Sequence, residues 1–381
     1  MTLRPTSSDL PAHLTRLPDL DAAWTEASAG VRLDAVRRDG RRLRDTLADR
    51  GPAIAVRTAD LITFPYPTGY GLQGAARSPA PYVMMRNRVQ LVQVDCEGTL
   101  INILVNPSDP ERSKHAPFFA RQVERYGELV ARRLMTQTHG TVAGALAAWG
   151  VDPADIDYVT FDHLHVQDLR GLLGTTEPEP GATAPTPALL PNARLLVQAR
   201  ELRILDHLHP LQVDWFVADG IRGVSPDRFV VVDGDYAVGA GFAIVRTPGH
   251  TEGNHSPTIV TSRGLWTISE NGVCADAYAP ESSRIPGLRA WARATGCEVV
   301  LNANTREHSL DQYTSMVLEK TLADPSTERP EFVQHFSSSE MVRHVLAPGL
   351  APTFSHGAIE HGQVQAKRTW RRGATATAAR A

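Results

Sequence analysis

The stretch "YVTFDHLHVQDLRGLLG", Tyr158 to Gly174, decides how the rest of this sequence is read. It opens with a short apolar run whose β-branched and aromatic residues are typical of a buried strand. His163 and His165 stand one residue apart at the end of that run, and side chains at i and i+2 of an extended chain point to the same side. Both imidazoles can therefore reach one cation. An H-x-H pair alone is a weak signal, so a metal site needs a further ligand.

A third histidine, His250, ends a later apolar run in the stretch "TPGHTEGNHS". The Pro-Gly turn before it is expected to aim the side chain at the rim of a sheet. Three nitrogen ligands with an open fourth position are the arrangement of a catalytic zinc site rather than a structural one. Such a site lowers the pKa of a bound water to about 7 and supplies hydroxide at neutral pH.

The composition limits the class of protein. The chain has 381 residues, a formal net charge of −3, 42% hydrophobic residues and 21% charged residues, which is ordinary for one large globular domain or two modest ones. The near-neutral charge argues against a nucleic-acid partner. Three cysteines are too few for a disulfide framework and fit no zinc ribbon. We see neither a membrane span nor a signal peptide and expect a cytoplasmic protein.

The order of the predicted elements gives the fold class. Residues 20–50 have helical spacing, and residues 82–108 read as a hairpin that turns at Glu97-Gly98. Residues 228–250 are a further run of strands. Single helices alternate with these antiparallel runs, which predicts an α+β protein. The expected architecture is a four-layer αββα sandwich, in which two mixed sheets lie face to face and helices cover the outside.

Three parts are expected along the chain: a helical N-terminal extension over residues 1–55, the catalytic domain over residues 56–325, and a C-terminal extension over residues 326–381. The last part ends in a basic tail that we expect to be disordered. Within the domain, the Pro/Thr-rich residues 175–191 form a loop, for which a lid and a disordered surface insert are both open.

At these motifs the sequence resembles the metallo-β-lactamase-fold hydrolases, nearest to their lactonase-like branch. "IDYVTFDHLHVQD" is similar to that family's strand and first metal motif, which reads H-x-H-x-D-H. "PNARLLVQARE" is similar to the strand and helix that follow, and "VVDGDYAVGAGFAIVRTPGHTEGNHS" to the stretch that carries the third histidine. The likeness runs from about Ile62 to His308. It implies the αββα fold and metal-dependent hydrolysis.

The sequence departs from the family pattern at the second metal site. Gln167 stands where the family has an aspartate, and Asp168 where it has a histidine. Asn254 occupies the place of a second histidine, Glu270 that of a bridging aspartate, and His308 best matches the last motif histidine. The resemblance therefore implies an intact first site of three histidines. It also implies a second site rebuilt from Asp168, Glu270 and His308, unless that site binds nothing.

Zn²⁺ is the expected ion, as one or two ions, and Mn²⁺ and Fe are the alternatives that a carboxylate-rich second site would favour. Because Gln167 removes a negative charge there, we favour one ion, and Gln167→Asp should strengthen a second. Asp168 is the candidate catalytic base, with a helix cap as the equal alternative. Glu270 is a ligand or a hydrogen-bond partner of one. Gln167, Tyr70 and Trp215 are expected to contact substrate, although core packing is the commoner fate of aromatic residues.

We hypothesise a hydrolase that uses a metal-bound hydroxide to cleave an ester, a lactone or another activated C–O bond, aryl ethers included, in a small organic substrate. An iron-dependent oxidoreductase on the same fold is one alternative. A non-catalytic subunit of a complex is the other, since Gln167 and Asn254 are also consistent with decay of a site. The apolar residues 332–362 predict a homo-oligomer or a hetero-complex through the terminal extensions. No nucleic-acid or membrane partner is expected.

Overall fold

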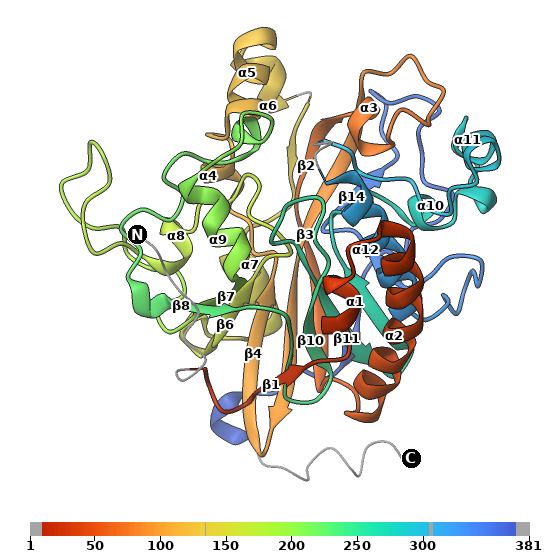
Figure 1. Cartoon of the computed structure of the whole chain (residues 1–381). Helices are drawn as coiled ribbons and strands as arrows, with labels where there is room; N and C mark the ends of the chain where they lie inside the picture. The colour runs from red at the N-terminus through yellow and green to blue at the C-terminus, as the bar shows by residue number, and fades with distance from the viewer. Residues whose placement is uncertain (1–9, 134, 305–307, 371–381) are drawn as a thin grey trace.

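Two β-sheets lie face to face between layers of helices in the computed structural model (Figure 1). The structure describes residues 10–133, 135–304 and 308–370. The predicted four-layer αββα sandwich is therefore confirmed. The end of the basic tail expected at the C-terminus, residues 371–381, lies outside the described residues.

The smaller sheet has six strands that run antiparallel, except that β13 is parallel to β12. In spatial order the strands are β1 (Leu14–Leu17), β9 (Asp235–Val238), β10 (Phe242–Arg246), β11 (His255–Thr261), β12 (Gly264–Ile268) and β13 (His335–Phe336).

The larger sheet has nine strands and is also mixed, because β4, β6, β7 and β8 pair in parallel and the others antiparallel. Its main path is β15 (His361–Gly362), β2 (Ala55–Pro67), β3 (Tyr82–Cys96), β4 (Thr99–Val105), β6 (Tyr158–Thr160), β7 (Arg194–Gln198) and β8 (Phe229–Val232), with β14 (Ser339–Val342) beside β3 and β5 (Gln137–Thr138) beside β2.

Alternation along the strands separates the core between the sheets from the core under the helices. In β4, Ile101 and Ile103 face the smaller sheet, whereas Leu104 packs in the cluster beneath the helices. The predicted β3–β4 hairpin is confirmed, with Cys96 opposite Thr99. Its two turn residues, Glu97 and Gly98, have φ values of 54° and 93°, as the type I′ turn of a two-residue hairpin requires.

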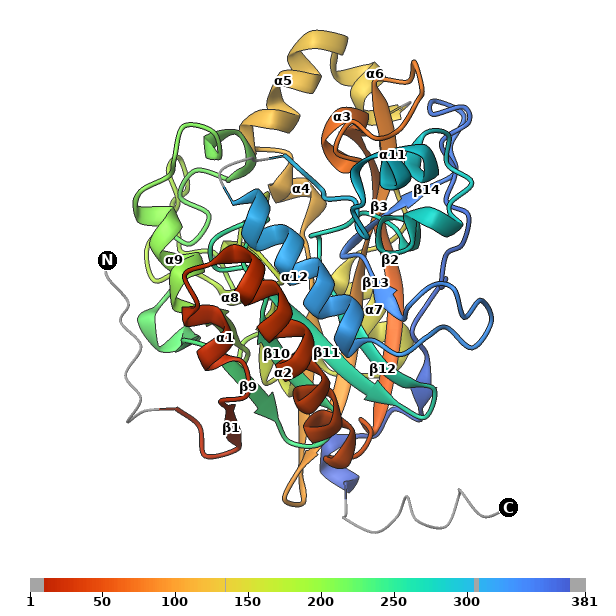
Figure 2. The same ribbon diagram turned by 45° about the vertical axis from the view of Figure 1, so that its right-hand side comes forward.

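Helices cover both outer faces, and α2 and α12 lie side by side over the smaller sheet (Figure 2). A Cβ at Gly40 of α2 would come within 2.8 Å of the Leu318 side chain of α12, so a glycine permits this close packing. No helix within the described parts of the chain is long and apolar enough to cross a membrane. The α-helices are α1 (Asp21–Thr25), α2 (Ala29–Asp49), α3 (Thr68–Gly71), α4 (Pro110–Ser113), α5 (Pro117–Tyr126), α6 (Glu128–Arg133), α7 (Val142–Trp149), α8 (Arg170–Leu173), α9 (Ala199–Asp206), α10 (Ala275–Tyr278), α11 (Leu288–Thr295) and α12 (Ser309–Leu322).

Segments near both ends of the chain join the sheets: β1 pairs with β9, and β14 pairs with β3. A buried ion pair fastens β14. The Arg88 guanidinium donates to the Glu340 carboxylate at 2.6 Å and to Asp60 at 2.9 Å, and Arg88 is only 4% exposed. Removing one partner of a buried pair leaves the other charge uncompensated, which costs far more than losing a surface pair.

We therefore expect Arg88→Met to lower the free energy of unfolding by about 3–5 kcal/mol, because Glu340 would be left buried without its cation. Arg86→Met is the matched control. Arg86 also binds Asp60, at 2.8 Å, but its side chain is 30% exposed, so its loss should cost less than about 1 kcal/mol. Urea unfolding of both variants measures the difference. Equal midpoints for the two variants would contradict this account of β14.

Candidate metal centre

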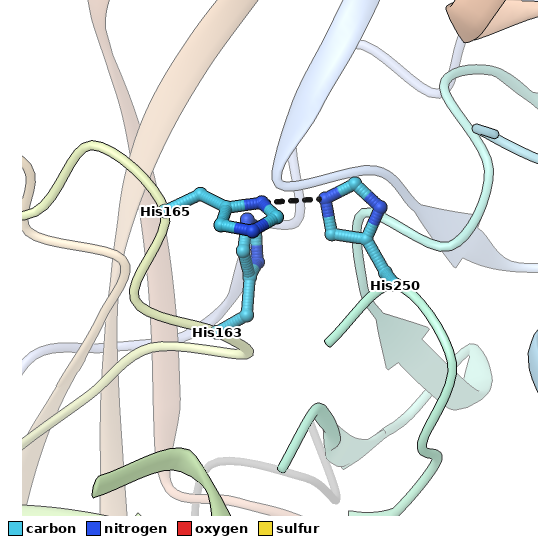
Figure 3. Close-up of side chains that lie close together, drawn as sticks. All are labelled: His163, His165 and His250. Carbon is cyan, nitrogen blue, oxygen red and sulfur yellow. Dashed lines mark hydrogen bonds between the residues drawn. The ribbon is translucent and has the colours of Figure 1, made fainter. Parts of the chain in front are cut away.

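Three histidines from the two sheets converge on one point (Figure 3). His163 and His165 lie in the loop that follows β6 of the larger sheet, and His250 lies in the turn between β10 and β11 of the smaller sheet. One ring nitrogen from each lies within 4.8 Å of the other two, and all three residues are buried. Strand β6 ends at Thr160, so the two histidines project from a loop and not from the extended strand that the sequence suggested.

The protonation of His165 and His250 suits a cation. Nδ1 of His165 and Nε2 of His250 lie 3.2 Å apart. Burial, together with the neighbouring His163, holds the pKa values of His165 and His250 well below the usual range. Both rings are therefore neutral at pH 7, and each keeps one nitrogen lone pair. Neutral imidazoles are the histidine form that binds metals, so these residues fit a bound ion.

Asp162 orients the first histidine of the triad. Its Oδ2 accepts Nδ1–H of His163 at 2.9 Å and the backbone N–H of Glu270 at 2.8 Å. Burial opposes a charge on His163, but the Asp162 carboxylate outweighs it and raises the pKa of that ring. With Nδ1 engaged, Nε2 is the nitrogen left to bind a metal, and a carboxylate behind a ligand histidine is a recurring arrangement. Sequence reasoning gave Asp162 no role, although its position directly before His163 was a usable signal.

Hydrogen bonds and close packing against α12 fix the turn that carries His250. The His250 backbone N–H donates to Oδ1 of Asn271 at 3.2 Å, and the His250 ring faces the carbonyl of Asn302 at 3.4 Å. The Gln312 side chain of α12 donates to that same carbonyl at 2.7 Å. A Cβ at Gly249 would come within 2.2 Å of the Gln312 Cα, so only glycine lets this turn rest on the helix.

The structure does not bring Asp168 to the histidines. Its carboxylate accepts the backbone N–H of Arg170 at 3.1 Å and the Arg170 side chain at 2.9 and 2.5 Å, and it binds Arg112 at 3.3 Å. Two guanidinium groups thus hold this buried carboxylate at the start of α8. Asp168 is not part of the converging group, and it directly precedes Leu169, the N-cap residue of α8, so its predicted roles as ligand, base or cap stay predictions.

Among the described residues, only His163, His165 and His250 form a group of three or more metal-binding side chains. Glu270 lines the same pocket as the triad, but its Oε2 accepts the backbone N–H of Ser339 at 2.7 Å. Burial and the nearby Asp162 raise the pKa of Glu270 to about 8. Neither Glu270 nor His308 joins the triad as a ligand in this arrangement.

His308 stands at the start of α12, with a 31% exposed side chain that lies 3.7 Å from Glu252. Asn254, in the place of the family's second histidine, donates to the carbonyl of Thr247 at 2.9 Å. This hydrogen bond stabilises the turn between β10 and β11, in which Asn254 lies. Both side chains have protein partners that lie outside the triad.

The loop of the triad contains a strained residue. Val166, between His165 and Gln167, has a φ of 57°, which is an outlier for a β-branched side chain. Its N–H donates to the carbonyl of Trp215 at 2.6 Å, so this contact holds the strained backbone in place. Sequence reasoning could not detect the strain, because nothing in the local sequence demands it.

A cavity of about 530 Å³ opens onto the triad. Gln167 and Trp215, both predicted to contact substrate, line it. Tyr70 does not. It is 39% exposed and packs edge-on against the Trp215 ring at 6.1 Å, beside a second, smaller hollow. Apolar and polar side chains both line the main cavity. The apolar ones include Ile62, Phe64, Met85, Phe119, Val123 and Met135, and the polar ones include Asn87, Asn106, Ser108, Ser113 and Glu270.

We expect His163→Ala and His250→Ala each to abolish tight Zn²⁺ binding, because either change leaves two ligands of three. His335→Asn is the control, since His335 is buried against Thr267 and belongs to no such group. Zinc content after dialysis, with circular dichroism to check folding, measures the effect. Full zinc occupancy in a folded His163→Ala protein would show that the triad is not the site.

No family model matches the chain. An N-acyl homoserine lactonase (AttM) of Azorhizobium caulinodans is 28% identical in an alignment of 193 residues, which covers 44% of this chain and 65% of that protein. The chain thus aligns with just under two thirds of the length of this curated relative.

Among solved structures, the dizinc quorum-quenching lactonase AidC, in complex with its product, is similar with a TM-score of 0.48 and 14% identity, covering 83% of this chain and 97% of that one. A quorum-quenching N-acyl homoserine lactone lactonase has a TM-score of 0.43 and 16% identity, covering 65% and 88%. The chain combines an αββα fold and the H-x-H…H triad with a partial sequence likeness to an N-acyl homoserine lactonase.

Proposed function

We propose that this chain is a metal-dependent hydrolase that cleaves a lactone, an ester or another activated C–O bond, aryl ethers included, in a small organic substrate. The observation that carries the proposal is the group of three buried imidazoles that lines a cavity of about 530 Å³. A cavity of this size suits a small organic molecule. The relative of known activity is an N-acyl homoserine lactonase, so lactones are the first substrates to test.

The ion that we propose is Zn²⁺, held by His163, His165 and His250. When bound there, it would activate water as a nucleophile and polarise the bond to be cleaved. The protein's own groups supply orientation and protons. Asp162 keeps His163 in the tautomer that leaves Nε2 free. In place of Asp168, which was predicted as the catalytic base, we propose Glu270 as a proton donor, because it lines the cavity and its raised pKa of about 8 favours the protonated form at pH 7 without the metal.

The cavity also suggests how a substrate lies. Apolar side chains of β2, β3 and α5, such as Phe64, Met85 and Phe119, line it together with polar ones. We propose that an apolar acyl or aryl group packs against these side chains and leaves the reactive bond beside the histidines.

We propose one tightly bound ion in each chain. The described residues form only one group of metal ligands, Gln167 is neutral, and two arginines hold Asp168. Calorimetric titration of the apo protein should show one tight equivalent of Zn²⁺, with hydrolysis saturating at that equivalent. In Gln167→Asp a second equivalent should remain weaker than the first, because Asp168 stays with Arg112 and Arg170. Two tight equivalents in the unmutated protein, both needed for turnover, would contradict the single-ion proposal.

Hydrolysis itself needs a direct test. The zinc-loaded protein should open N-acyl homoserine lactones or related lactones, measured as acid release at constant pH, and a chelator should abolish the reaction until Zn²⁺ is restored. Aryl esters and aryl ethers complete the panel. His163→Ala serves as the matched inactive protein. A zinc-loaded protein that turns over none of these substrates would count against the hydrolase and favour the non-catalytic subunit.

We also propose that this chain forms a homo-oligomer or a complex with a different chain. Much of the apolar segment over residues 332–362 packs on its own chain through β13, β14 and β15. Val345 and Leu346 remain 87% and 43% exposed, and they are the part of this segment that a second chain would cover.

A further inference from the structure

A buried carboxylate connects the two loops that carry the triad. Glu201 lies in the first turn of α9 and is 1% exposed. Its Oε1 accepts the backbone N–H of Leu164 at 2.7 Å, and its Oε2 accepts the hydroxyl of Thr251 at 2.6 Å. Leu164 separates His163 from His165, and Thr251 directly follows His250. One side chain therefore bonds next to all three candidate ligands.

The backbone packing around Glu201 is equally close. A Cβ at Gly253 would lie 2.1 Å from the Glu201 nitrogen and 2.5 Å from its Cα. Any larger residue at this position would push the His250 turn away from α9. The close contact at Gly253 and the hydrogen bond from Thr251 to Glu201 therefore both fix the β10–β11 turn against the start of α9.

The bonding chemistry makes the bridge specific. Both partners of Glu201 are donors, and an ionised carboxylate is acceptor-only, with one oxygen available for each. A glutamine would keep both contacts only by reversing the one to Thr251, with its amide donating to the hydroxyl, and an aspartate is one methylene shorter. Few side chains could therefore satisfy both loops at once.

We propose that Glu201 is a positioning residue that sets the separation of the His163–His165 loop from the His250 turn and so controls metal affinity. The proposal rests on the metal-binding part of the proposed function. Glu201 is not itself a ligand, because it is absent from the group of converging metal-binding side chains. Partners that orient ligands from behind typically contribute about 10–100-fold to metal affinity.

A second buried carboxylate provides a matched control. Asp276 is 0% exposed, accepts the Ser283 hydroxyl at 2.6 Å and the Thr353 backbone N–H at 2.9 Å, and so also connects two segments. None of its partners adjoins a triad histidine. Asp276→Asn should therefore loosen the fold in a comparable way without moving the ligands.

The experiment compares Glu201→Gln and Thr251→Val with Asp276→Asn, each as full-length folded apo protein. The readouts are the Zn²⁺ dissociation constant by competition with a chelating dye and the visible absorption of the Co²⁺-loaded protein. We expect the dissociation constant to rise about 10–100-fold in Glu201→Gln and Thr251→Val, with an altered Co²⁺ spectrum. Asp276→Asn should keep the parent's affinity and spectrum. Thr251→Val removes one side of the bridge and leaves the Glu201 side chain in place.

Parent-like zinc affinity in both bridge variants would overturn the positioning role. An equal loss of affinity in Asp276→Asn would also overturn it, because the effect would then reflect general loosening. If the parent binds no Zn²⁺, the proposed metal site fails and the inference fails with it. If the parent binds Zn²⁺ but hydrolyses nothing, only the hydrolase proposal fails, and the dissociation constants still decide the role of Glu201.

Discussion

The candidate metal centre requires that three buried imidazoles from two different sheets lie close to one point. His163 and His165 belong to the larger sheet and His250 to the smaller one, so the packing of the sheets sets the distance between them. Ile103 of β4 and Ile244 of β10 lie in the fully buried cluster between the sheets. Close-packed interiors transmit small displacements. A core change at these positions would therefore reach the triad.

A polar network under the His250 turn completes that support. Glu319 of α12 accepts hydrogen bonds from Ser256 at 2.8 Å, from Asn271 at 2.7 Å and from Tyr278 at 2.5 Å. Asn271 in turn accepts the backbone N–H of His250. Burial raises the pKa of Glu319 to about 7, against the hydrogen bonds that favour its charged form. Satisfied buried networks of this kind favour one arrangement of the chain, which explains why so many polar side chains lie beneath the turn.

The fold and the triad could be predicted from sequence because their signals are local. The alternation in β4, the Glu97-Gly98 turn and the two histidine motifs each report on a few consecutive residues. Asp168 shows the limit of prediction from local sequence. Its spacing from His165 is right for a ligand, but Arg112, which is distant in sequence, and Arg170 bind its carboxylate. Glu201 was overlooked for the same reason, since its partners come from two separate loops.

The placement of charge around the triad follows one pattern. The three candidate ligands include no carboxylate, so a bound cation would keep most of its charge for polarising water and substrate. The negative charges stand behind the ligands instead. Asp162 bonds to the far nitrogen of His163, and Glu201 bonds to the two ligand loops. Charge held at that distance favours the cation in the site while quenching less of its reactivity than a direct carboxylate ligand would. Such an arrangement is consistent with the single ion that we propose, because Asp168, the carboxylate expected in a second site, is held by Arg112 and Arg170 instead.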